Sequence, residues 1–212
     1  MQTEYWDQIA DDKVFSHPLN LDVFRRLVGV KERIVDWGCG YGRILAELHG
    51  AGYANLLGLD ASARMIARAS REHPHLEFRQ STGLVMSEPV GSIDAIILFA
   101  VLTCIPDDDD QVRLLAECQR VLRPGGLLYV SDLYLNSDAR NVARYDRFEN
   151  QFGVRGVFQL EDGGIMRHHD EHWIRGLFGA FECLYHEEFT VRTMNNNSSR
   201  AFQYFGRKTS DQ

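Results

Sequence analysis

The stretch IVDWGCGYG, residues 34–42, places glycines at three alternate positions directly after an apolar run and an acid, Asp36. Glycine adopts backbone conformations with positive φ and lets another molecule approach the main chain, at an entropic cost that a purely structural turn rarely needs three times. A ligand is therefore expected to lie against the loop that contains Gly38, Gly40 and Gly42. A tight strand-to-helix connection, with Asp36 as a turn cap, is the alternative.

A second acid, Asp60, follows the next apolar run, 18 residues after Gly42. In open parallel sheets, ligands bind beyond the carboxyl ends of the strands, where a carboxylate can accept hydrogen bonds from both hydroxyls of a ribose. The dinucleotide pattern G-x-G-x-x-G fails because its third small position is Arg43, which would obstruct the close packing that a pyrophosphate site needs. The loop therefore favours a nucleoside without phosphates.

The densest titratable cluster in the chain is RHHDEH, residues 167–172. One of its histidines, His168 or His169, could act as a general base toward a bound substrate, because imidazole titrates near neutral pH. Adjacent histidines usually point apart, so the cluster does not predict a metal site. A solvated helix start, with Asp170 as its N-cap, is the alternative interpretation.

Composition favours one domain that acts on a small molecule. With 212 residues, of which 44% are hydrophobic, the chain is long enough to bury one substantial core, and a single domain over 1–212 is expected. The formal net charge is -7, and only Lys13, Lys31 and Lys208 are lysines. Proteins that neutralise several phosphates usually carry a basic face, so nucleic acid is not an expected partner.

The cysteines and the apolar runs indicate a cytoplasmic protein. Cys39, Cys104, Cys118 and Cys183 form no C-x-x-C pair, which argues against structural zinc and a disulfide framework and fits reduced thiols. The acidic N-terminal segment lacks the apolar core of a signal peptide, and no apolar run reaches the ~18 residues that span a bilayer. We therefore expect no membrane segment.

Strand-like apolar runs alternate with amphipathic segments through the first two thirds of the chain, which is typical of a parallel sheet covered by helices on both faces. Strands are expected at 33–36, 55–60, 76–79, 93–99 and 126–132. Helices are expected at 43–49, 63–72 and 110–122, the last opening with an acidic run that suits a helix N-terminus. The RPGG sequence at 123–126 would end that helix and turn the chain.

The last third of the chain changes character. A helix at 170–178 is followed by two alternating runs, 181–191 and 199–207, joined by the turn-prone sequence NNNSS. This pattern predicts an antiparallel hairpin that completes the sheet. The fold class is therefore α/β, with a doubly wound seven-stranded sheet that is mostly parallel and has an antiparallel strand from the C-terminal hairpin.

Four separated motifs resemble the class I S-adenosylmethionine-dependent methyltransferases. The glycine loop at 34–42 matches the family's hydrophobic-hydrophobic-acid-x-G-x-G-x-G motif, and LGLDAS at 57–62 is similar to its second stretch, which ends near a ribose-binding acid. SIDAII at 92–97 is similar to the fourth strand, and VLRPGG at 121–126 to the start of the fifth. The matches cover about 30–132 and imply a Rossmann-like fold with S-adenosyl-L-methionine as the cofactor.

The resemblance also implies which residues contact the cofactor. The loop runs beneath it, with Gly38 and Gly40 near its methionine part, Asp60 holds the ribose, and Met65 or Ala61 packs on the adenine. The other residues implied at the cofactor are Asp36, Cys39, Gly42 and Phe99.

The resemblance implies two further groups of cofactor contacts, one of which departs from the family's usual pattern. The family often places an aspartate after the third strand to bind the adenine amino group, and this chain has Thr82, followed by Gly83, in that place. Trp6 falls in an N-terminal helix of the kind that folds over the cofactor in this family. Ordinary amphipathic packing is the alternative for this indole.

The resemblance divides the single domain into an N-terminal helical lid at about 1–30, a cofactor-binding core at 30–132, a substrate-side helical insertion at 133–180 and the hairpin at 181–207. Small-molecule methyltransferases commonly build the acceptor site after the fifth strand, which implies Tyr134, Tyr145 and Arg147 as substrate contacts. Arg147 could clamp a carboxylate. Core packing or surface exposure is the alternative for each.

After the fourth strand, LFAV at 98–101 lacks both the Asn/Asp-Pro-Pro-aromatic signature and the Pro-Cys nucleophile of the enzymes that methylate DNA bases or glutamine amides. We therefore expect methyl transfer to an oxygen, nitrogen or carboxylate of a small molecule. Two alternatives stay open. One is a regulator or subunit that binds the cofactor without an acceptor cavity, and the other is a nicotinamide-dependent oxidoreductase, against which Arg43 and the pairing of Asp36 with Asp60 argue.

Overall fold

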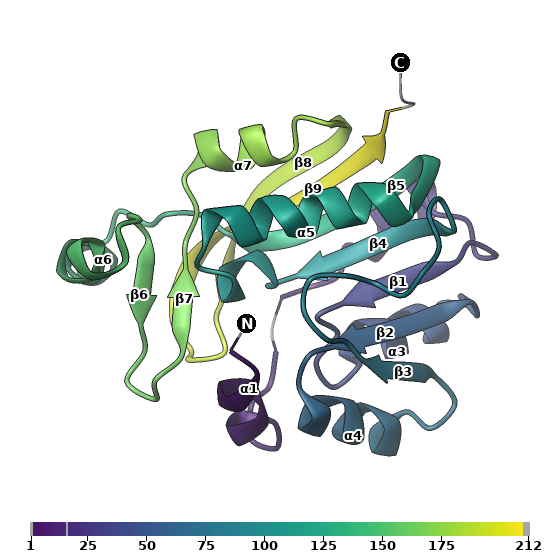
Figure 1. Cartoon of the computed structure of the whole chain (residues 1–212), viewed down its shortest axis with the longest axis horizontal. Coiled ribbons are helices and arrows are strands. Elements are labelled where there is room, and N and C mark those ends of the chain that lie inside the picture. The colour runs from purple at the N-terminus through teal and green to yellow at the C-terminus, as the bar shows by residue number, and fades with distance from the viewer. Residues whose placement is uncertain (1, 16, 210–212) are drawn as a thin grey trace.

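The computed structural model describes residues 2–15 and 17–209, so Met1 and Ser16 of the predicted lid lie outside the described residues. A seven-stranded sheet has the order β3-β2-β1-β4-β5-β9-β8 (Figure 1). Its parallel strands β1 to β5 are Ile34–Trp37, Leu56–Asp60, Glu77–Gln80, Ile93–Phe99 and Leu122–Leu133. Strand β9 (Ser198–Lys208) runs antiparallel to both β5 and β8 (Phe181–Arg192). The predicted mostly parallel α/β sheet is confirmed.

Helices cover both faces of this sheet (Figure 1). Helices α2 (Leu21–Leu27) and α3 (Arg43–Gly50) pack on one face, and α5 (Asp108–Val121) and α7 (Glu171–Leu177) on the other. Strand β4 shows why: Ile96 and Leu98 belong to the core under α5, whereas Ile97 and Phe99 belong to the core under α2 and α3. A strand buried on both faces is a nearly continuous apolar run, and β4 is charged only at Asp94. Helix α4 (Ala63–Glu72) flanks β2 and β3.

The chain passes from α5 into β5 without the expected turn. Helix α5 ends at Val121 and β5 begins at Leu122, so RPGG lies inside the strand. Gly125 has φ 73°, and the pairing of β4 with β5 shifts register between Ile93 and Ala95. The glycine therefore produces an irregularity at the start of the strand instead of a separate loop.

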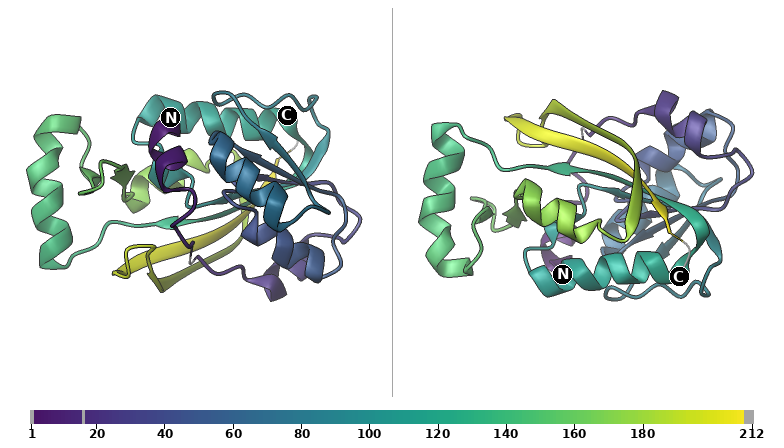
Figure 2. Two further views of the ribbon diagram at one scale, coloured as in Figure 1. Left: turned by 90° about the horizontal axis from the view of Figure 1, so that it is seen from below. Right: turned by 90° about the horizontal axis from the view of Figure 1, so that it is seen from above.

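The sequence predicts a helical insertion at 133–180. The structure differs, because the segment between β5 and β8 contains two strands as well as helices. Helix α6 (Ala139–Phe152) is followed by a two-stranded ribbon, β6 (Val157–Gln159) and β7 (Ile165–Arg167), before α7. The sequence LEDGG, residues 160–164, joins the two short strands, and Gly163 adopts φ 94° there. This glycine turn is the local signal for a hairpin. Figure 2 shows α6, in green, at one end of the molecule.

Helix α1 (Thr3–Ile9) lies between the ribbon and α4 (Figure 1). The side-chain amide of Gln2 accepts a hydrogen bond from the backbone N–H of Ile165 at 2.6 Å and donates one to its carbonyl at 2.5 Å. On the opposite side, Asp7 accepts hydrogen bonds from the Ser62 hydroxyl and, at 3.1 Å, from the Arg64 backbone N–H at the start of α4. The N-terminal segment thus bridges two parts of the fold. A short 3-10 helix, Leu102–Cys104, follows β4.

Gly42 precedes α3 as its N-cap with φ 83°, and a Cβ atom there would lie 2.6 Å from Cζ of Phe78. We predict that Gly42→Ala lowers the free energy of unfolding by about 2–4 kcal/mol, because it adds left-handed strain and a collision in the core. Gly50, near the end of α3, has no atom within 4 Å of such a Cβ, so Gly50→Ala should be neutral or stabilising by up to about 1 kcal/mol. Urea unfolding followed by circular dichroism measures both, and equal effects would contradict the prediction.

Candidate functional site

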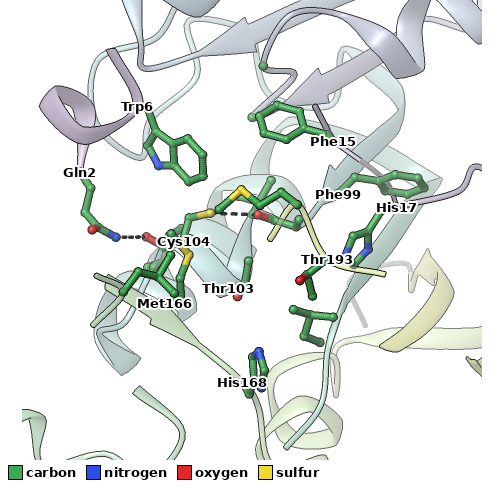
Figure 3. Close-up of a pocket in the computed structure, with 18 of the residues that line it drawn as sticks. Gln2, Trp6, Phe15, His17, Phe99, Thr103, Cys104, Met166, His168 and Thr193 are labelled. Atoms are coloured by element: carbon green, nitrogen blue, oxygen red, sulfur yellow. Dashed lines mark hydrogen bonds between the residues drawn. The ribbon is translucent and has the colours of Figure 1, made fainter. Parts of the chain in front are cut away.

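A cavity of about 1060 Å³ opens at the carboxyl ends of the central parallel strands. Its wall combines the loop after β1, the N-terminal segment, α6, the ribbon and the turn between β8 and β9. Figure 3 shows Trp6 and Phe15 at the top of the view and His168 at the bottom, with the cavity between them. The sheet therefore supplies one side of the site, and segments outside the parallel core close it.

The three glycines of the loop all have positive φ, at 81°, 54° and 83° for Gly38, Gly40 and Gly42. The backbone N–H groups of Gly38 and Cys39 both donate to the carbonyl of Leu59, at 2.7 and 3.0 Å. The N–H of Gly40 donates to Oδ2 of Asp60 at 2.8 Å. The loop is therefore folded back onto the end of β2, which fixes the carboxylate beside it.

The Asp60 carboxylate has hydrogen-bond acceptor positions that remain open to a ligand. Its Oδ1 accepts from the Ser62 backbone N–H at 2.8 Å, so each carboxylate oxygen has one protein donor. An ionised carboxylate oxygen can accept two hydrogen bonds, which leaves one position on each oxygen. Asp60 lines the cavity, and burial raises the pKa of its carboxyl, although hydrogen bonds from backbone N–H groups, those of Ser62 and Gly40 foremost, oppose the shift. Two adjacent hydroxyls are the natural partner for such a pair of acceptors.

Asp36, at the start of the loop, is a buried carboxyl that lacks a partner. Neither of its oxygens has a hydrogen bond among the described residues, although the side chain is only 1% exposed. Burial raises its pKa to about 7, and the nearby Arg43 guanidinium only partly opposes this shift. An unpaired buried acid is costly to keep in a fold, and this one faces a cavity. It is available for a donor or a cation from a ligand.

An apolar wall adjoins Asp60. Met65 is fully buried against Trp6 and Phe15 from the N-terminal segment. Phe15 stacks on Tyr41 with ring centroids 5.2 Å apart, and Trp6 meets Phe15 edge-on at 6.2 Å. A Cβ atom on Gly40 would lie 2.4 Å from the ring of Phe15, so the glycine is required for this closed position of the N-terminal segment. The wall suits a flat aromatic ligand.

The far end of the cavity is basic. Arg140, Arg144 and Arg147 line it from one side of α6, because positions i, i+4 and i+7 share a helix face. His168, which follows β7, lies beside Arg144, with 3.4 Å between its Nε2 and a guanidinium nitrogen. Burial lowers the pKa of His168 well below its usual value, so the ring is neutral at pH 7. The cavity thus has acids at the glycine loop and arginines at α6.

Most of the predicted site residues meet at this cavity. Those that line it are Trp6, Asp36, Gly38, Cys39, Gly40, Asp60, Ala61, Met65, Phe99, Arg147 and His168. The sequence interpretation missed several others, namely Phe15, His17, Arg43, Ser81, Arg140 and Arg144. The spacing of the arginines in the α6 sequence was a usable signal, whereas nothing in the sequence singles out His17.

His169 is placed away from the cavity, contrary to expectation. It is fully buried, with Nδ1 3.0 Å from the carbonyl of Leu133 and Nε2 2.9 Å from the amide of Gln111. Burial lowers its pKa to about 3. Adjacent residues in extended backbone point to opposite sides, so only one of the two histidines can reach the cavity.

The two tyrosines also lie outside the cavity lining. Tyr134 is stacked on Phe202 in the core, and its hydroxyl lies 3.1 Å from Nε2 of His186. Tyr145 is 1% exposed and contacts His168 from behind, with 2.6 Å between its hydroxyl and Nδ1. Both side chains are held by the interior, so neither is a direct wall of the site.

Gly42, Thr82 and Gly83, which the sequence also placed at the cofactor, do not line the cavity. Gly42 lies under Phe78 and serves the packing of α3. Thr82 and Gly83 are exposed, and Ser81 lines the cavity in their place. The Ser81 hydroxyl is buried and has no hydrogen-bond partner among the described residues. Ser81, directly after the end of β3 at Gln80, is therefore the residue of this turn that lines the cavity.

His17 is a neutral histidine in the cavity wall. Its Nδ1 lies 3.2 Å from the hydroxyl of Ser131, and burial, with Arg43 adding to the effect, lowers its pKa to about 4. Within residues 2–15 and 17–209, no three His, Cys, Asp or Glu side chains gather as a metal site would require. Over the same residues, no helix combines the length and the apolar character needed to span a bilayer.

Comparison with known proteins gives consistent matches. A family model described as a methyltransferase domain matches residues 34–126. A trans-aconitate 2-methyltransferase from Deinococcus radiodurans is 41% identical over 100 residues, which are 46% of this chain and 36% of that protein. A ubiquinone biosynthesis O-methyltransferase from Pseudomonas aeruginosa is 27% identical over 143 residues, 64% of this chain and 60% of that protein. The chain thus spans less than two thirds of the length of these relatives.

Among solved structures, a S-adenosylmethionine-dependent methyltransferase from Methanosarcina mazei has the same fold. It superposes with a TM-score of 0.84 and is 24% identical, and the match covers 89% of this chain and 98% of that one. The match covers more of the chain than residues 34–126, so the structural similarity extends beyond the segment that the family model matches.

The buried Asp36 carboxyl predicts a pH-dependent effect on stability. Its folded pKa is raised to about 7, above the unfolded value near 3.8, so the folded state binds the extra proton and ionisation costs stability as pH rises from about 4 to 7. When the pH is raised from 5 to 8, the free energy of unfolding of Asp36→Asn should therefore rise relative to that of the wild type by on the order of 2 kcal/mol. The exposed Asp109→Asn serves as the control, and denaturant unfolding at both pH values is the measurement. A difference that does not grow with pH would contradict the prediction.

Proposed function

We propose that the chain is a class I S-adenosylmethionine-dependent methyltransferase, which transfers a methyl group to a small-molecule acceptor bound in this cavity. One observation carries the proposal. Beside a glycine loop that matches the family motif, Asp60 presents two free acceptor positions to a cavity of about 1060 Å³, which has room for a nucleoside cofactor and a second molecule.

The residues present fit the cofactor. Asp60 would accept hydrogen bonds from the ribose hydroxyls, and the wall of Trp6, Phe15 and Met65 would hold the adenine. The unpaired Asp36 carboxylate would meet the ammonium of the methionine part, and the unpaired Ser81 hydroxyl would meet a polar edge of the base. When bound, the cofactor supplies a methyl group on a positively charged sulfur, which is already an activated donor.

The protein's own task is then to align the acceptor and to exclude water. The N-terminal segment performs the exclusion in this proposal, because it covers the cavity and is held on both sides. Lys13 donates to Asp162 of the ribbon turn at 3.3 Å and to Asn195 of the β8–β9 turn at 3.1 Å. Arg68 of α4 donates to the carbonyl of Ala10 at 2.8 Å. These contacts span the opening of the cavity.

Proton removal depends on the atom that receives the methyl group. A carboxylate, a thiolate or a neutral amine needs no base, whereas a hydroxyl would need one. Of the residues proposed from sequence, His168 remains a candidate by position, and His17 is a second neutral histidine in the wall. His169 is not retained, since it faces the interior. The relatives are named as enzymes that act on small molecules, which supports an acceptor of that size. We propose a cytoplasmic location as well.

The alternatives receive less support from the site. A regulator without an acceptor cavity would have its rim filled by protein, but here the cavity continues from the glycine loop to α6. For an oxidoreductase, Arg43 occupies the place where a dinucleotide site needs a small residue, and it donates to the His17 carbonyl at the rim. Calorimetric titration with NAD tests the second alternative directly.

Titration calorimetry tests the proposed cofactor site. S-adenosylmethionine and S-adenosylhomocysteine should bind the wild type, and Asp60→Ala should weaken both by about 1–3 kcal/mol, which corresponds to about 5- to 150-fold in Kd. Asp109→Ala, an exposed acid on α5, is the matched control and should bind like the wild type. A folded wild type that binds neither compound would refute the proposal.

A further inference from the structure

One region of the cavity wall is apolar and is rich in sulfur and aromatic rings. Its buried members are Phe158 of β6 and Met166 of β7. Side chains from α1, the 3-10 helix, α6, the ribbon turn and the turn between β8 and β9 pack against the same cluster, are partly buried and also line the cavity: Trp6, Cys104, Phe148, Leu160 and Met194. We call the space bordered by these seven side chains the apolar chamber.

The apolar chamber adjoins the place proposed for the cofactor. Trp6 packs against the cluster that contains Met166 and also against the cluster that contains Met65, which borders the proposed adenine position. Figure 3 shows Trp6, Cys104 and Met166 on the same side of the cavity. A molecule in the chamber would therefore lie beside the cofactor within one cavity.

Polar groups next to the chamber are already bonded within the protein. The Thr103 hydroxyl donates to the carbonyl of Arg167 at 2.7 Å, and the Cys104 thiol donates to the carbonyl of Ala100 at 3.1 Å. The Gln2 amide forms hydrogen bonds in both directions with the backbone of β7. Burial raises the pKa of the Cys104 thiol well above its usual value, so this side chain is neutral at pH 7. None of these groups requires a charged ligand.

Arg144, beside the chamber, is balanced within the protein. Its guanidinium lies over the ring of Phe158 at 3.5 Å, and a terminal nitrogen donates to Nε2 of His168 at 3.4 Å. Asp138, the N-cap of α6, contributes counter-charge. The buried Nε of Arg144 has no hydrogen-bond partner among the described residues, and a neutral oxygen can satisfy this single N–H. Arg144 therefore does not require an anion.

The other charged side chains on this side of the cavity are exposed. Arg140 and Arg147 of α6 and Glu161 of the ribbon turn are in this class. Asp162, also exposed, is paired with Lys13 at 3.3 Å. Exposed charges are hydrated and need no counter-ion from a ligand. The chamber thus offers apolar surface, with its charges either solvated or paired.

The sulfur atoms favour an aromatic ligand over an aliphatic one. Met166 and Met194 present polarisable thioethers and Cys104 a neutral thiol, and sulfur makes favourable contacts with aromatic rings that it does not make with alkyl chains. The rings of Trp6 and Phe158 add edge-on or offset contacts that only another ring can form. A flat, uncharged ring therefore matches this wall best.

We propose that the apolar chamber binds an uncharged aromatic ring of the methyl acceptor, so that the substrate class is small aromatic compounds. The inference rests on the proposed function and names its substrate class. A charged group in the chamber would lose its hydration and gain few partners in return, because the neighbouring polar groups are already engaged. The unpartnered Nε of Arg144 is compatible with one neutral oxygen on such a ring.

The methionines provide reporters for both claims. The chain contains five methionines, and ¹³C-methyl-methionine labelling makes each visible by nuclear magnetic resonance, with signals assigned from methionine-to-leucine variants. Saturating S-adenosylhomocysteine should shift the Met65 signal through the ring current of its adenine. Subsequent addition of 2-naphthol at pH 7 should shift the Met166 and Met194 signals saturably. Met86, in the core under α5, should not respond.

Two compounds of similar size test the charge and the ring separately. The anion 2-naphthoate should bind at least about tenfold more weakly than 2-naphthol, because its carboxylate would lose hydration. Decahydro-2-naphthol keeps the hydroxyl but has no aromatic ring. It should bind at least about fivefold more weakly, because the contacts of sulfur and of aromatic side chains with a ring are lost.

Met166→Gln has a similar size and should weaken 2-naphthol binding at least about tenfold, while S-adenosylhomocysteine binds within about twofold of the wild type. Met194→Gln, in the partly buried turn, replaces it if the first variant does not fold. Met86→Leu changes a buried methionine outside the cavity and is the matched control, which should bind both compounds like the wild type.

Each outcome decides between the two claims. A Met65 response to S-adenosylhomocysteine without a response of Met166 and Met194 to 2-naphthol would overturn the chamber and leave the proposed function intact. Equal binding of 2-naphthoate would overturn the preference for an uncharged ligand, and equal binding of decahydro-2-naphthol would overturn the aromatic assignment. Absence of cofactor binding would instead refute the proposed function.

Discussion

The hydrogen bond from the Gly40 backbone N–H to Asp60 is the contact on which the site depends. It requires β1 and β2 to be parallel neighbours, so that the loop after one strand reaches the carboxylate at the end of the other. It also requires glycine at φ 54°, where a side chain would be strained. Together with the bonds to the Leu59 carbonyl, it fixes the loop before any ligand arrives. Preorganised acceptors of this kind lower the cost of ordering on binding.

Beside this fixed loop, the cavity wall contains buried polar groups that cost the free protein stability, because they lack hydrogen-bond partners. Among the described residues, the Asp36 carboxylate oxygens, the Ser81 hydroxyl and the Nε of Arg144 have no hydrogen-bond partner. Each is a buried polar group whose interactions are left for a ligand. The unpaired groups also lie in order along the cavity, from acids beside the loop to arginines on α6.

The sequence predicted the parallel core well because β1, β2, β4 and β5 are rich in apolar residues and largely buried, and the glycine loop and Asp60 mark the ends of β1 and β2. Gly38, Gly40, Asp60 and Met65 all line the cavity, because the local motifs that contain them determine their positions. The far wall was predicted poorly. Side-chain direction decided between His168 and His169, and the ribbon turn at Gly163 was overlooked within a segment predicted to be helical. His17 and Phe15 reach the site only through the tertiary path of the N-terminal segment, which no local pattern encodes.

The most direct test of the account is a crystal structure of the protein with S-adenosylhomocysteine. The account predicts that the ribose hydroxyls lie within hydrogen-bond distance of the Asp60 carboxylate, that the amino group meets Asp36, and that the space between the sulfur and Arg144 remains accessible to a second molecule. Density for the compound elsewhere on the protein, or in the cavity with its ribose away from Asp60, would contradict the central claim.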